Sequence, residues 1–224
     1  MKNIVLTGAS DGLGKEFAKL CLKENINIIA LCRTKPDYEC DFIKTDLTSE
    51  ESIINACNLI KEKYDRVDCL VNSAGVPGIE KLDSITYSCI DNLFKINTLA
   101  PIFLTSQLID LIKKSEGDII NVGSTIGIKQ GFIDQLAYTT SKWGLRGTSA
   151  NLQLELKKHN VRVIQINLGG MNTRLHEKCT GIKIENPNEW MNPKDIAGIM
   201  LYVIKLPKMV EISEMTINRK NYRS

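Results

Sequence analysis

The sequence lacks the features that mark several large classes of protein. Its 29 Lys and Arg residues form no run longer than a pair, so no basic patch of the kind that binds nucleic acid is predicted. No apolar stretch reaches the ~18 residues that cross a bilayer, and no signal peptide is apparent at the start. The seven cysteines include no Cys-x-x-Cys pair, which disfavours a disulfide framework or a structural zinc site. A cytoplasmic protein without metal, membrane or nucleic-acid partners is predicted.

The composition of the sequence is typical of one globular domain. Its 224 residues are 43% hydrophobic and 25% charged, and a chain of this length buries roughly 70% of the surface that its unfolded form exposes. No repeat, low-complexity tract or linker divides it. Residues 1–224 are therefore predicted to form a single domain.

Short runs rich in Ile and Val alternate with helical patterns along the chain. Seven of these runs are predicted to be strands: Asn3–Leu6, Asn27–Leu31, Phe42–Thr45, Val67–Val71, Asp118–Val122, Val161–Ile166 and Ser213–Ile217. Most lack polar alternation, as strands buried on both faces do, and most of the intervening segments are long enough for crossover helices. The pattern predicts an α/β fold of the Rossmann type, a doubly wound parallel sheet of about seven strands between two layers of helices.

Punctuation residues predict where some helices begin. Thr48-Ser49-Glu50-Glu51 has the form of a capping box, and Asn192-Pro193 that of a cap followed by a first-turn proline. Between Arg33 and Phe42 only the eight residues TKPDYECD intervene, too few for a crossover helix. That side of the sheet is predicted to be thinly covered.

The first glycine-rich stretch, Gly8-Ala9-Ser10-Asp11-Gly12-Leu13-Gly14, follows a predicted strand and precedes a helix predicted from Lys15 to about Lys23. Three glycines and the amide groups of a helix start lie where a diphosphate can accept their hydrogen bonds. The spacing is Gly-x-x-x-Gly-x-Gly and not the Gly-x-Gly-x-x-Gly of the standard dinucleotide fingerprint. Taken alone, the stretch leaves a glycine-rich turn without a ligand open.

Further motifs occur in register with this stretch. Tyr138 and Lys142 are four residues apart, so they share one face of a helix, and Ser124 lies just past a predicted strand. Together with Thr7-Gly8-x-x-x-Gly12-x-Gly14, Asn72-Ser73-Ala74-Gly75 and Asn97, they stand in the order and approximate spacing of the short-chain dehydrogenase/reductase family. The chain resembles that family over nearly its whole length.

The resemblance implies hydride transfer between NADP(H) and a carbonyl or alcohol substrate. It assigns the acid/base role to Tyr138, the substrate-oxygen hydrogen bond to Ser124, and a relay water behind the lysine to Asn97. Lys142 would hold the nicotinamide ribose and lower the pKa of the tyrosine, since a unit charge ~4–5 Å away contributes roughly 3–4 kcal/mol at an effective dielectric of ~20. A sugar-nucleotide epimerase or dehydratase and a non-catalytic NADP-binding regulator stay open as alternatives.

For the cofactor, the resemblance assigns contacts to Gly8, Ser10, Asp11, Gly12, Leu13, Gly14, Arg33, Asp46, Leu47, Asn72, Ala74, Gly75, Tyr138, Lys142, Gly169, Met171 and Thr173. Cys32-Arg33 stands where an acidic residue would bind the ribose of NAD, so NADP(H) is favoured over NAD(H). Asp11 is discordant, because some NADP-preferring relatives carry a basic residue there. Leu168 replaces the proline of the family's Asn-Pro-Gly, which predicts a less rigid loop.

Several of these residues also have a structural interpretation. Asn97 can cap or kink its apolar helix, with Pro101 one turn later, Asp46 can cap the next helix, and Thr125 is the nearest rival of Ser124. Residues 174–192 are expected to form a flap with few regular elements, in which His176 is an exposed loop residue. For Trp190 the sequence does not decide between the pocket wall and the flap hinge.

A homodimer or homotetramer is expected from the same resemblance. The helices near Ser84–Lys114 and Tyr138–His159 would pair with their copies, and apolar residues such as Leu145, Leu152 and Leu156 are predicted to serve as the contact face.

Overall fold

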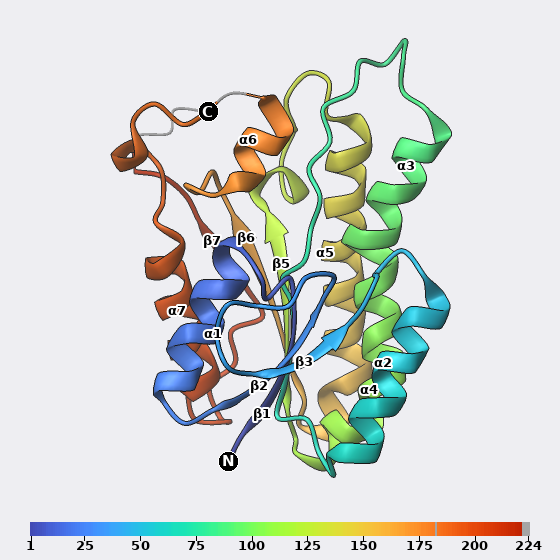
Figure 1. Ribbon diagram of the computed structural model, residues 1–224, viewed down its shortest axis with the longest axis vertical. Helices are drawn as coiled ribbons and strands as arrows, with labels where there is room; N and C mark the ends of the chain where they lie inside the picture. Colours follow the sequence, from blue (N-terminus) through green and yellow to red (C-terminus); the bar gives the residue numbers. More distant parts are fainter. Residues whose placement is uncertain (182, 221–224) are drawn as a thin grey trace.

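Seven parallel strands form one sheet in the computed structural model (Figure 1). The structure describes residues 1–181 and 183–220, the side chains of residues 178–180 excepted. The strands are β1 (Asn3–Thr7), β2 (Asn27–Cys32), β3 (Asp41–Lys44), β4 (Cys69–Asn72), β5 (Asp118–Ser124), β6 (Arg162–Leu168) and β7 (Glu214–Ile217). Their order across the sheet is β3-β2-β1-β4-β5-β6-β7, so the predicted doubly wound α/β fold is confirmed.

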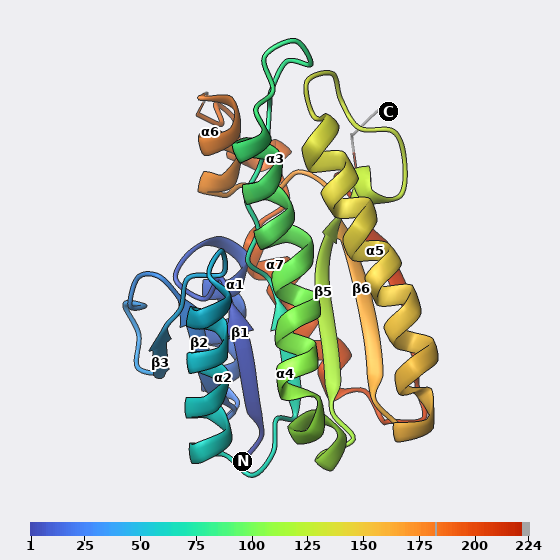
Figure 2. The same cartoon turned by 90° about the vertical axis from the view of Figure 1, so that its right-hand side faces the viewer.

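Helices cover both faces of the sheet (Figure 2). One face carries α1 (Gly12–Lys23) and α7 (Pro193–Lys205). The other carries α2 (Glu50–Lys63), α4 (Ala100–Lys114) and α5 (Leu136–Leu156), and α3 (Tyr87–Phe94) continues into α4 through the π-helical turn η1 (Lys95–Leu99). The short elements are η2 (Thr125–Gly127), η3 (Lys157–His159), α6 (Arg174–Thr180) and η4 (Pro187–Glu189).

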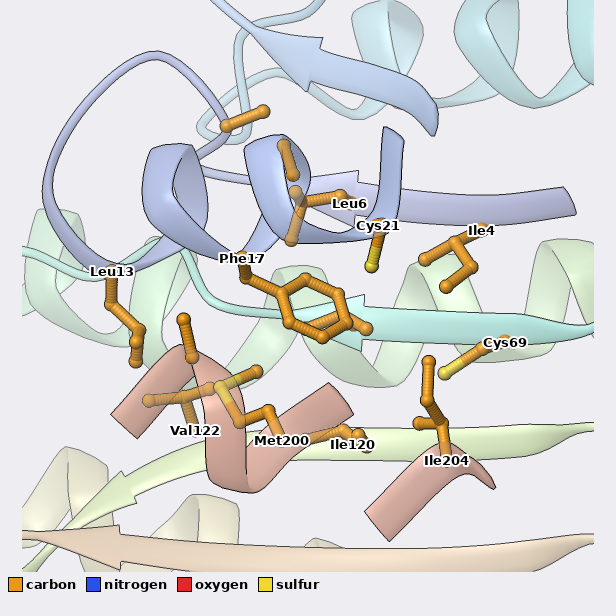
Figure 3. Packing of buried hydrophobic residues seen from close by; sticks show 14 of the residues in the cluster. Ile4, Leu6, Leu13, Phe17, Cys21, Cys69, Ile120, Val122, Met200 and Ile204 are labelled. Atoms are coloured by element: carbon orange, nitrogen blue, oxygen red, sulfur yellow. The ribbon is translucent and has the colours of Figure 1, made fainter. Parts of the chain in front are cut away.

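Apolar side chains fill the space between the sheet and each helical layer. Under α1 and α7, the fully buried ring of Phe17 lies among Ile4, Cys21, Met200 and further residues of the same cluster (Figure 3). A second cluster fills the opposite face beneath α2 and α4. Because both faces are covered, the central strands need apolar residues at consecutive positions, which explains their lack of alternation.

Strand ends differ from the predicted ones by up to two residues. β4 begins at Cys69 and not at Val67, because the Val67 N–H donates to the carbonyl of Leu111 on α4 and not to a neighbouring strand. β5 and β6 continue to Ser124 and Leu168, which pair in register. These longer ends carry the polar side chains of the site above the sheet.

Two predicted helix starts are wrong. α1 begins at Gly12 and not at Lys15, because the Asp11 carboxylate caps it by accepting the Gly12 N–H at 2.9 Å. The cap of α2 is Ser49, whose hydroxyl accepts the Ser52 N–H, so the predicted capping box from Thr48 does not form. Asn192 caps α7 with a first-turn proline after it, as predicted.

The predicted dimer face on α5 is wrong for two of its residues. Leu145 and Leu156 are 1% and 5% exposed and belong to this chain's own interior. Leu152 is half-buried and packs against the same interior. The face of α5 that carries Leu145 points to the sheet, because Lys142 and Ser149, on the same helical face, are buried as well.

The segment from Arg33 to Cys40 contains no helix, as its length predicts. Tyr38 partly replaces the missing cover, because its ring packs against the core and its hydroxyl donates to the Ala9 carbonyl at 2.6 Å. The pKa of Tyr38 is raised by burial, so this hydroxyl keeps its proton. Tyr38 thereby anchors the glycine-rich stretch that follows β1.

The chain reverses its direction across the sheet between β1 and β4. In doubly wound sheets, ligands bind outside the carboxyl ends of the strands at this reversal. The loops after β1, β2, β4, β5 and β6 all meet there, and α6 lies beyond the same end of the sheet (Figures 1 and 2).

Candidate active site

A cavity of about 970 Å³ opens at the carboxyl end of the sheet. The predicted site residues line it, with the exceptions of Asn72 and Asn97. The cavity extends from the loop after β2 past residues 8–14, the glycine loop, to the ends of β5 and β6. One continuous site therefore joins the predicted cofactor and catalytic residues.

The glycine loop has a shape that side chains would prevent. Gly8 and Gly12 have φ of +70° and +54°, in the region that favours glycine. A Cβ at Gly14 would lie 2.3 Å from the carbonyl oxygen of Gly8, and one at Gly8 would lie 2.9 Å from Ala74. The loop consequently packs tightly against the end of β4, and its backbone borders the cavity at the start of α1.

Thr7 fixes the position of the glycine loop relative to the segment after β4. Its hydroxyl oxygen accepts the N–H groups of Ser73 and Ala74, each at 3.0 Å. These residues belong to the stretch that the sequence resemblance assigned to the cofactor. Asn72 itself points away from the cavity, because its amide donates to the Asn121 side chain at 2.8 Å in the interior.

Exposed basic residues line the cavity beside the end of β2, where the resemblance places the adenosine. Arg33, Thr34 and Lys35 line the cavity and are exposed. Cys32 is 7% exposed, and burial raises the pKa of its thiol to about 11, so no negative charge lies at the end of β2. The exposed cations suit a phosphate on the adenosine ribose.

Two acidic residues of this end are already engaged. The Asp46 carboxylate accepts the backbone N–H and the hydroxyl of Thr48, which together lower its pKa. Ser49 and not Asp46 caps α2, so the capping role that the sequence left open for Asp46 is not the one observed. Asp46 closes the turn before the helix and still lines the cavity. Asp11 caps α1 and also lies 3.5 Å from the Arg174 guanidinium of α6.

Tyr138, Lys142 and Ser124 all line the cavity. Tyr138 and Ser124 are half-buried, whereas Lys142 is 5% exposed and donates to the Val122 carbonyl at 3.1 Å. Ser124 caps the turn η2 and is more open to the cavity than Thr125, which is buried. This difference in exposure favours Ser124 over Thr125 as the hydroxyl that meets a substrate.

Burial acts directly on Lys142. Removal of its ammonium group from water lowers its pKa to about 8. The side chain therefore stays largely protonated at neutral pH, and it brings a positive charge into the cavity wall one helical turn from Tyr138.

Asn97 lies behind the lysine, not in the cavity wall. Its side-chain amide binds both backbone groups of Val76, at 2.9 and 3.0 Å, and donates to the Ser141 hydroxyl. A Cβ at Gly75 would lie 3.4 Å from Asn97 Oδ1 and 3.5 Å from Lys142 Nζ. Asn97 thus holds the backbone of Gly75 and Val76 against the lysine.

The backbone around Asn97 is also unusual. Residues Lys95–Leu99 form a π-helical turn, in which the Ala100 N–H donates to the Lys95 carbonyl. Pro101 has no N–H to donate to the Asn97 carbonyl four residues earlier. The sequence offered a kinked helix as an alternative to a functional role, and a π-helical turn lies at this position together with the buried Asn97 amide. Such turns are frequent at functional sites.

A chain of buried hydrogen bonds, which sequence reasoning missed, ties α5 to the sheet. Asn121 of β5 donates to the Ser149 hydroxyl at 2.8 Å, and Ser149 bonds Gln165 of β6 at 2.6 Å. Ser149 lies seven residues after Lys142 on the same helical face. These bonds fix the height and rotation of the helix that carries Tyr138 and Lys142, and the polar residues within otherwise apolar strands were the available signal.

The loop after β6 closes the cavity on the side opposite Arg33. Gly169, Met171 and Thr173 line it, and Met171 forms a bridge with Met191. Residues 174–192, the flap, contain α6 and the turn η4 and are thus more regular than predicted. His176 lies on α6, half-buried with its ring centroid 4.4 Å from that of Trp190, so its assignment as an exposed loop residue is wrong.

Other kinds of site have no support in the described residues. No three His, Cys, Asp or Glu side chains converge there in a way that could hold a metal ion. In the same part of the chain, no helix combines the length and the apolar character needed to span a bilayer.

Comparison with known proteins gives the same family that the sequence motifs indicated. A family model described as short chain dehydrogenase matches residues 2–181. An uncharacterized oxidoreductase of Staphylococcus saprophyticus is 26% identical over 230 residues, which cover 96% of each chain.

Solved structures match over almost the whole chain. A metagenomic short-chain oxidoreductase in complex with NADP has a TM-score of 0.83 at 25% identity, over 99% of this chain and 98% of its own. A 4-hydroxyisoleucine dehydrogenase complexed with NADH has a TM-score of 0.86 at 25% identity, over 98% of each chain.

Proposed function

The chain belongs to the short-chain dehydrogenase family, and we propose that it is an NADP(H)-dependent oxidoreductase that interconverts a carbonyl compound and the corresponding alcohol. One observation carries this proposal: Tyr138, Lys142 and Ser124 line the same cavity as the glycine loop. Both the phosphate-binding backbone and the acid/base group are present in one site.

The residues of the cavity fit a nicotinamide dinucleotide. The absence of side chains at Gly8, Gly12 and Gly14 lets a diphosphate approach the start of α1. Arg33 and Lys35 offer cations for an adenosine phosphate, and the loop from Gly169 to Thr173 borders the other end. NADP(H), when bound, supplies or accepts the hydride.

Side chains of the protein transfer the proton and position the substrate. In the reductive direction, the Tyr138 hydroxyl gives its proton to the carbonyl oxygen, and Ser124 donates a hydrogen bond to the same oxygen. Lys142 favours the phenolate that remains, because its buried charge lies one turn away on α5. Asn97 holds the backbone of Gly75 and Val76 in place beside the Lys142 ammonium group.

Arg33 supports NADP(H) over NAD(H) in this proposal. Arg33→Ala is expected to raise the Kd for NADPH by about tenfold or more, the scale of a charge-assisted contact of ~1.5–3 kcal/mol, and to change the Kd for NADH much less. Fluorescence titration of both cofactors at fixed ionic strength measures the difference.

Cys32→Asp extends this test by placing a carboxylate where the neutral thiol now lies. The substitution should shift preference towards NADH, because the carboxylate repels a 2′-phosphate and accepts ribose hydroxyls. Equal losses for both cofactors in Arg33→Ala would assign the arginine to adenine stacking alone. An Arg33→Ala protein with unchanged preference for NADPH would refute the assignment.

The reaction itself is tested by product analysis. A panel of aldehydes, ketones and alcohols is offered with each cofactor, and both the organic product and the oxidised or reduced cofactor are quantified. The proposal predicts equimolar formation of the two. An epimerase or dehydratase would form product without net change of cofactor, and a non-catalytic regulator would bind cofactor and form none.

Self-association of the chain is part of the proposal, through the two helices that the sequence indicated but through other residues on them. Three large apolar side chains are exposed on these helices: Leu99 of η1 (52%), Ile102 of α4 (43%) and Trp143 of α5 (44%). The Thr98 hydroxyl donates to the Ser141 carbonyl at 2.8 Å and holds these helices together. The apolar outer surface suits pairing with a second copy.

Light scattering is expected to give a mass of at least twice the 25.1 kDa chain. Trp143→Glu should reduce it to one chain, since a charge at the centre of an apolar contact is costly to bury. A wild-type mass of one chain would refute both the homodimer and the homotetramer.

A further inference from the structure

Two side chains of the flap and one from beyond β7 stack in the cavity wall. Trp190 follows the turn η4, and its ring centroid lies 4.4 Å from that of His176 on α6. The guanidinium carbon of Arg219, two residues beyond β7, lies 4.2 Å from the same Trp190 ring. All three residues line the cavity.

Two glycines make room for this stack. A Cβ at Gly170 would lie 2.6 Å from the Trp190 ring and 3.4 Å from Arg219 Nε, and one at Gly169 would lie 2.1 Å from Asn218 Oδ1. That same oxygen accepts the Arg219 N–H at 2.9 Å. The backbone beside Arg219 is therefore fixed, and its side chain starts from the edge of the cavity.

Strand register places Arg219 near the catalytic residues. Ser124 pairs with Leu168, and Leu168 pairs with Ile217, on three adjacent strands. Two strand spacings of ~4.8 Å put Ile217 about 10 Å from Ser124. Arg219 follows two residues later, within reach of one end of a small molecule whose other end meets Ser124.

The charges of the cavity are unequally distributed. Among the described residues that line it, the carboxylates are those of Asp11, Asp37 and Asp46. Asp11 lies beside Arg174 and Asp37 lies 2.7 Å from Lys15, and these pairs flank the glycine loop. Arg219 adds a positive charge to the cavity wall beside Trp190.

We propose that Arg219 recognises an anionic group of the substrate and that the substrate is a small hydroxy acid or its oxo acid. The inference rests on the proposed function, because it names the substrate class of the same site. A planar guanidinium presents two parallel N–H groups to the two oxygens of a carboxylate, and stacking on an indole ring preserves its orientation. A single guanidinium matches a carboxylate better than a dianionic phosphate.

The redox chemistry of such a substrate balances. In the oxidative direction, the carbinol carbon loses a hydride to NADP⁺, and its hydroxyl loses a proton to Tyr138. The carbon–oxygen bond becomes a carbonyl, and the carboxylate that binds Arg219 is unchanged.

Matched acids and esters test the proposal. We would oxidise 2-, 3- and 4-hydroxy acids of four to six carbons, and their methyl esters, with NADP⁺. The wild type is expected to show a kcat/KM at least ~10-fold higher for the best acid than for its ester, the scale of a charge-assisted pair. Arg219→Met should lower kcat/KM for the acid and so bring the acid-to-ester ratio close to one. Arg219→Lys should keep part of the preference for the acid.

Lys220→Met is the matched control, because it removes one positive charge from the next, exposed residue. It should keep the wild-type ratio. A wild type that uses acid and ester equally, or an Arg219→Met protein that keeps the preference, would overturn the inference. Turnover of esters in either case would leave the proposed function intact. A phosphate ester preferred over every acid would overturn the carboxylate assignment.

A binding measurement decides the matter if no compound of the panel is turned over, an outcome that would count against the proposed function. The chain has two tryptophans, so Trp143→Phe leaves Trp190 as the sole indole. Titration of this protein with succinate in the presence of NADP⁺ should change its fluorescence saturably. Adding Arg219→Met should abolish the change, and an identical titration in both proteins would refute the inference.

Discussion

Tyr138→Phe is expected to lower turnover by at least ~100-fold, the usual size of a general acid/base contribution. The substitution keeps the ring that is half-buried in the cavity wall and removes only the hydroxyl. Cofactor affinity and the free energy of unfolding should change little, because the glycine loop and the core are untouched. Steady-state kinetics on the best substrate, with a cofactor titration and a denaturation curve, measure all three.

Phe132→Leu provides a comparison for the Tyr138 substitution. Phe132 is exposed at 59% and lines the cavity, so its replacement changes apolar surface without removing a proton donor. Turnover of this variant should fall much less than that of Tyr138→Phe. Near-normal turnover of Tyr138→Phe would remove the tyrosine from the mechanism.

Lys142→Met is expected to change activity and stability in opposite directions. Loss of a charge that contributes about 3 kcal/mol at an effective dielectric of ~20 should slow turnover by roughly 100-fold. The affinity for NADPH should fall as well, if the same ammonium holds the nicotinamide ribose. At pH 7 and without cofactor, however, the variant should be the more stable protein.

The sign of this stability change follows from the lowered pKa of Lys142. The folded protein binds this proton only up to a pKa of about 8, whereas the unfolded chain keeps it to about 10.4. Below pH 8 the buried charge therefore costs the fold about 3 kcal/mol, offset by about 1 kcal/mol for the hydrogen bond to Val122. The wild type regains this stability as the pH rises from 8 towards 10.

Urea denaturation at pH 7 and at pH 9.5 measures the difference. Lys142→Met should exceed the wild type by about 2 kcal/mol at pH 7, and the advantage should shrink or reverse at pH 9.5. Lys61→Met, at an exposed position on α2, should show neither effect. A Lys142→Met protein with lower stability at pH 7, or a difference independent of pH, would contradict the account of a desolvated ammonium.

The sheet could be predicted from the sequence because a strand buried on both faces leaves an uninterrupted apolar run. The runs at β1, β2 and β5 are of this kind, and their ends were found to within a few residues. Helix starts were less predictable, because several residues compete to cap them. Asp11 caps α1, which begins three residues before the predicted start, and Ser49 caps α2 in place of Thr48.

The orientation of α5 could not be read from its apolar residues. The helix is apolar on more than one side: Leu145 faces the sheet, while Trp143 and Leu154 are exposed. The polar residues Lys142 and Ser149 would have indicated the inner face of α5 better. Both are buried, Lys142 in the candidate site and Ser149 in the hydrogen-bond chain to the sheet. Their seven-residue spacing marks the inner face.

The catalytic end of the site could be anticipated, and the flap side could not. Tyr138 and Lys142 are close in sequence, so helical geometry alone relates them. His176, Trp190 and Arg219 meet only because β7 returns beside β6 and the flap crosses the same edge. Non-local contacts of this kind leave little local signal beyond the paired glycines Gly169 and Gly170.

We propose that the residues of this cavity bring about hydride transfer between NADP(H) and a carbonyl carbon. The most direct measurement uses NADPH labelled with deuterium at one or the other of the two C4 hydrogens. Mass spectrometry follows each label into the alcohol product, for the wild type and for Tyr138→Phe. We predict that one of the two labels places one deuterium on the carbinol carbon of each product molecule formed by the wild type. Tyr138→Phe should form product at about 1% of the wild-type rate or less. Alcohol formed without deuterium at that carbon from both C4 labels, or product formed equally fast by Tyr138→Phe, would contradict the account.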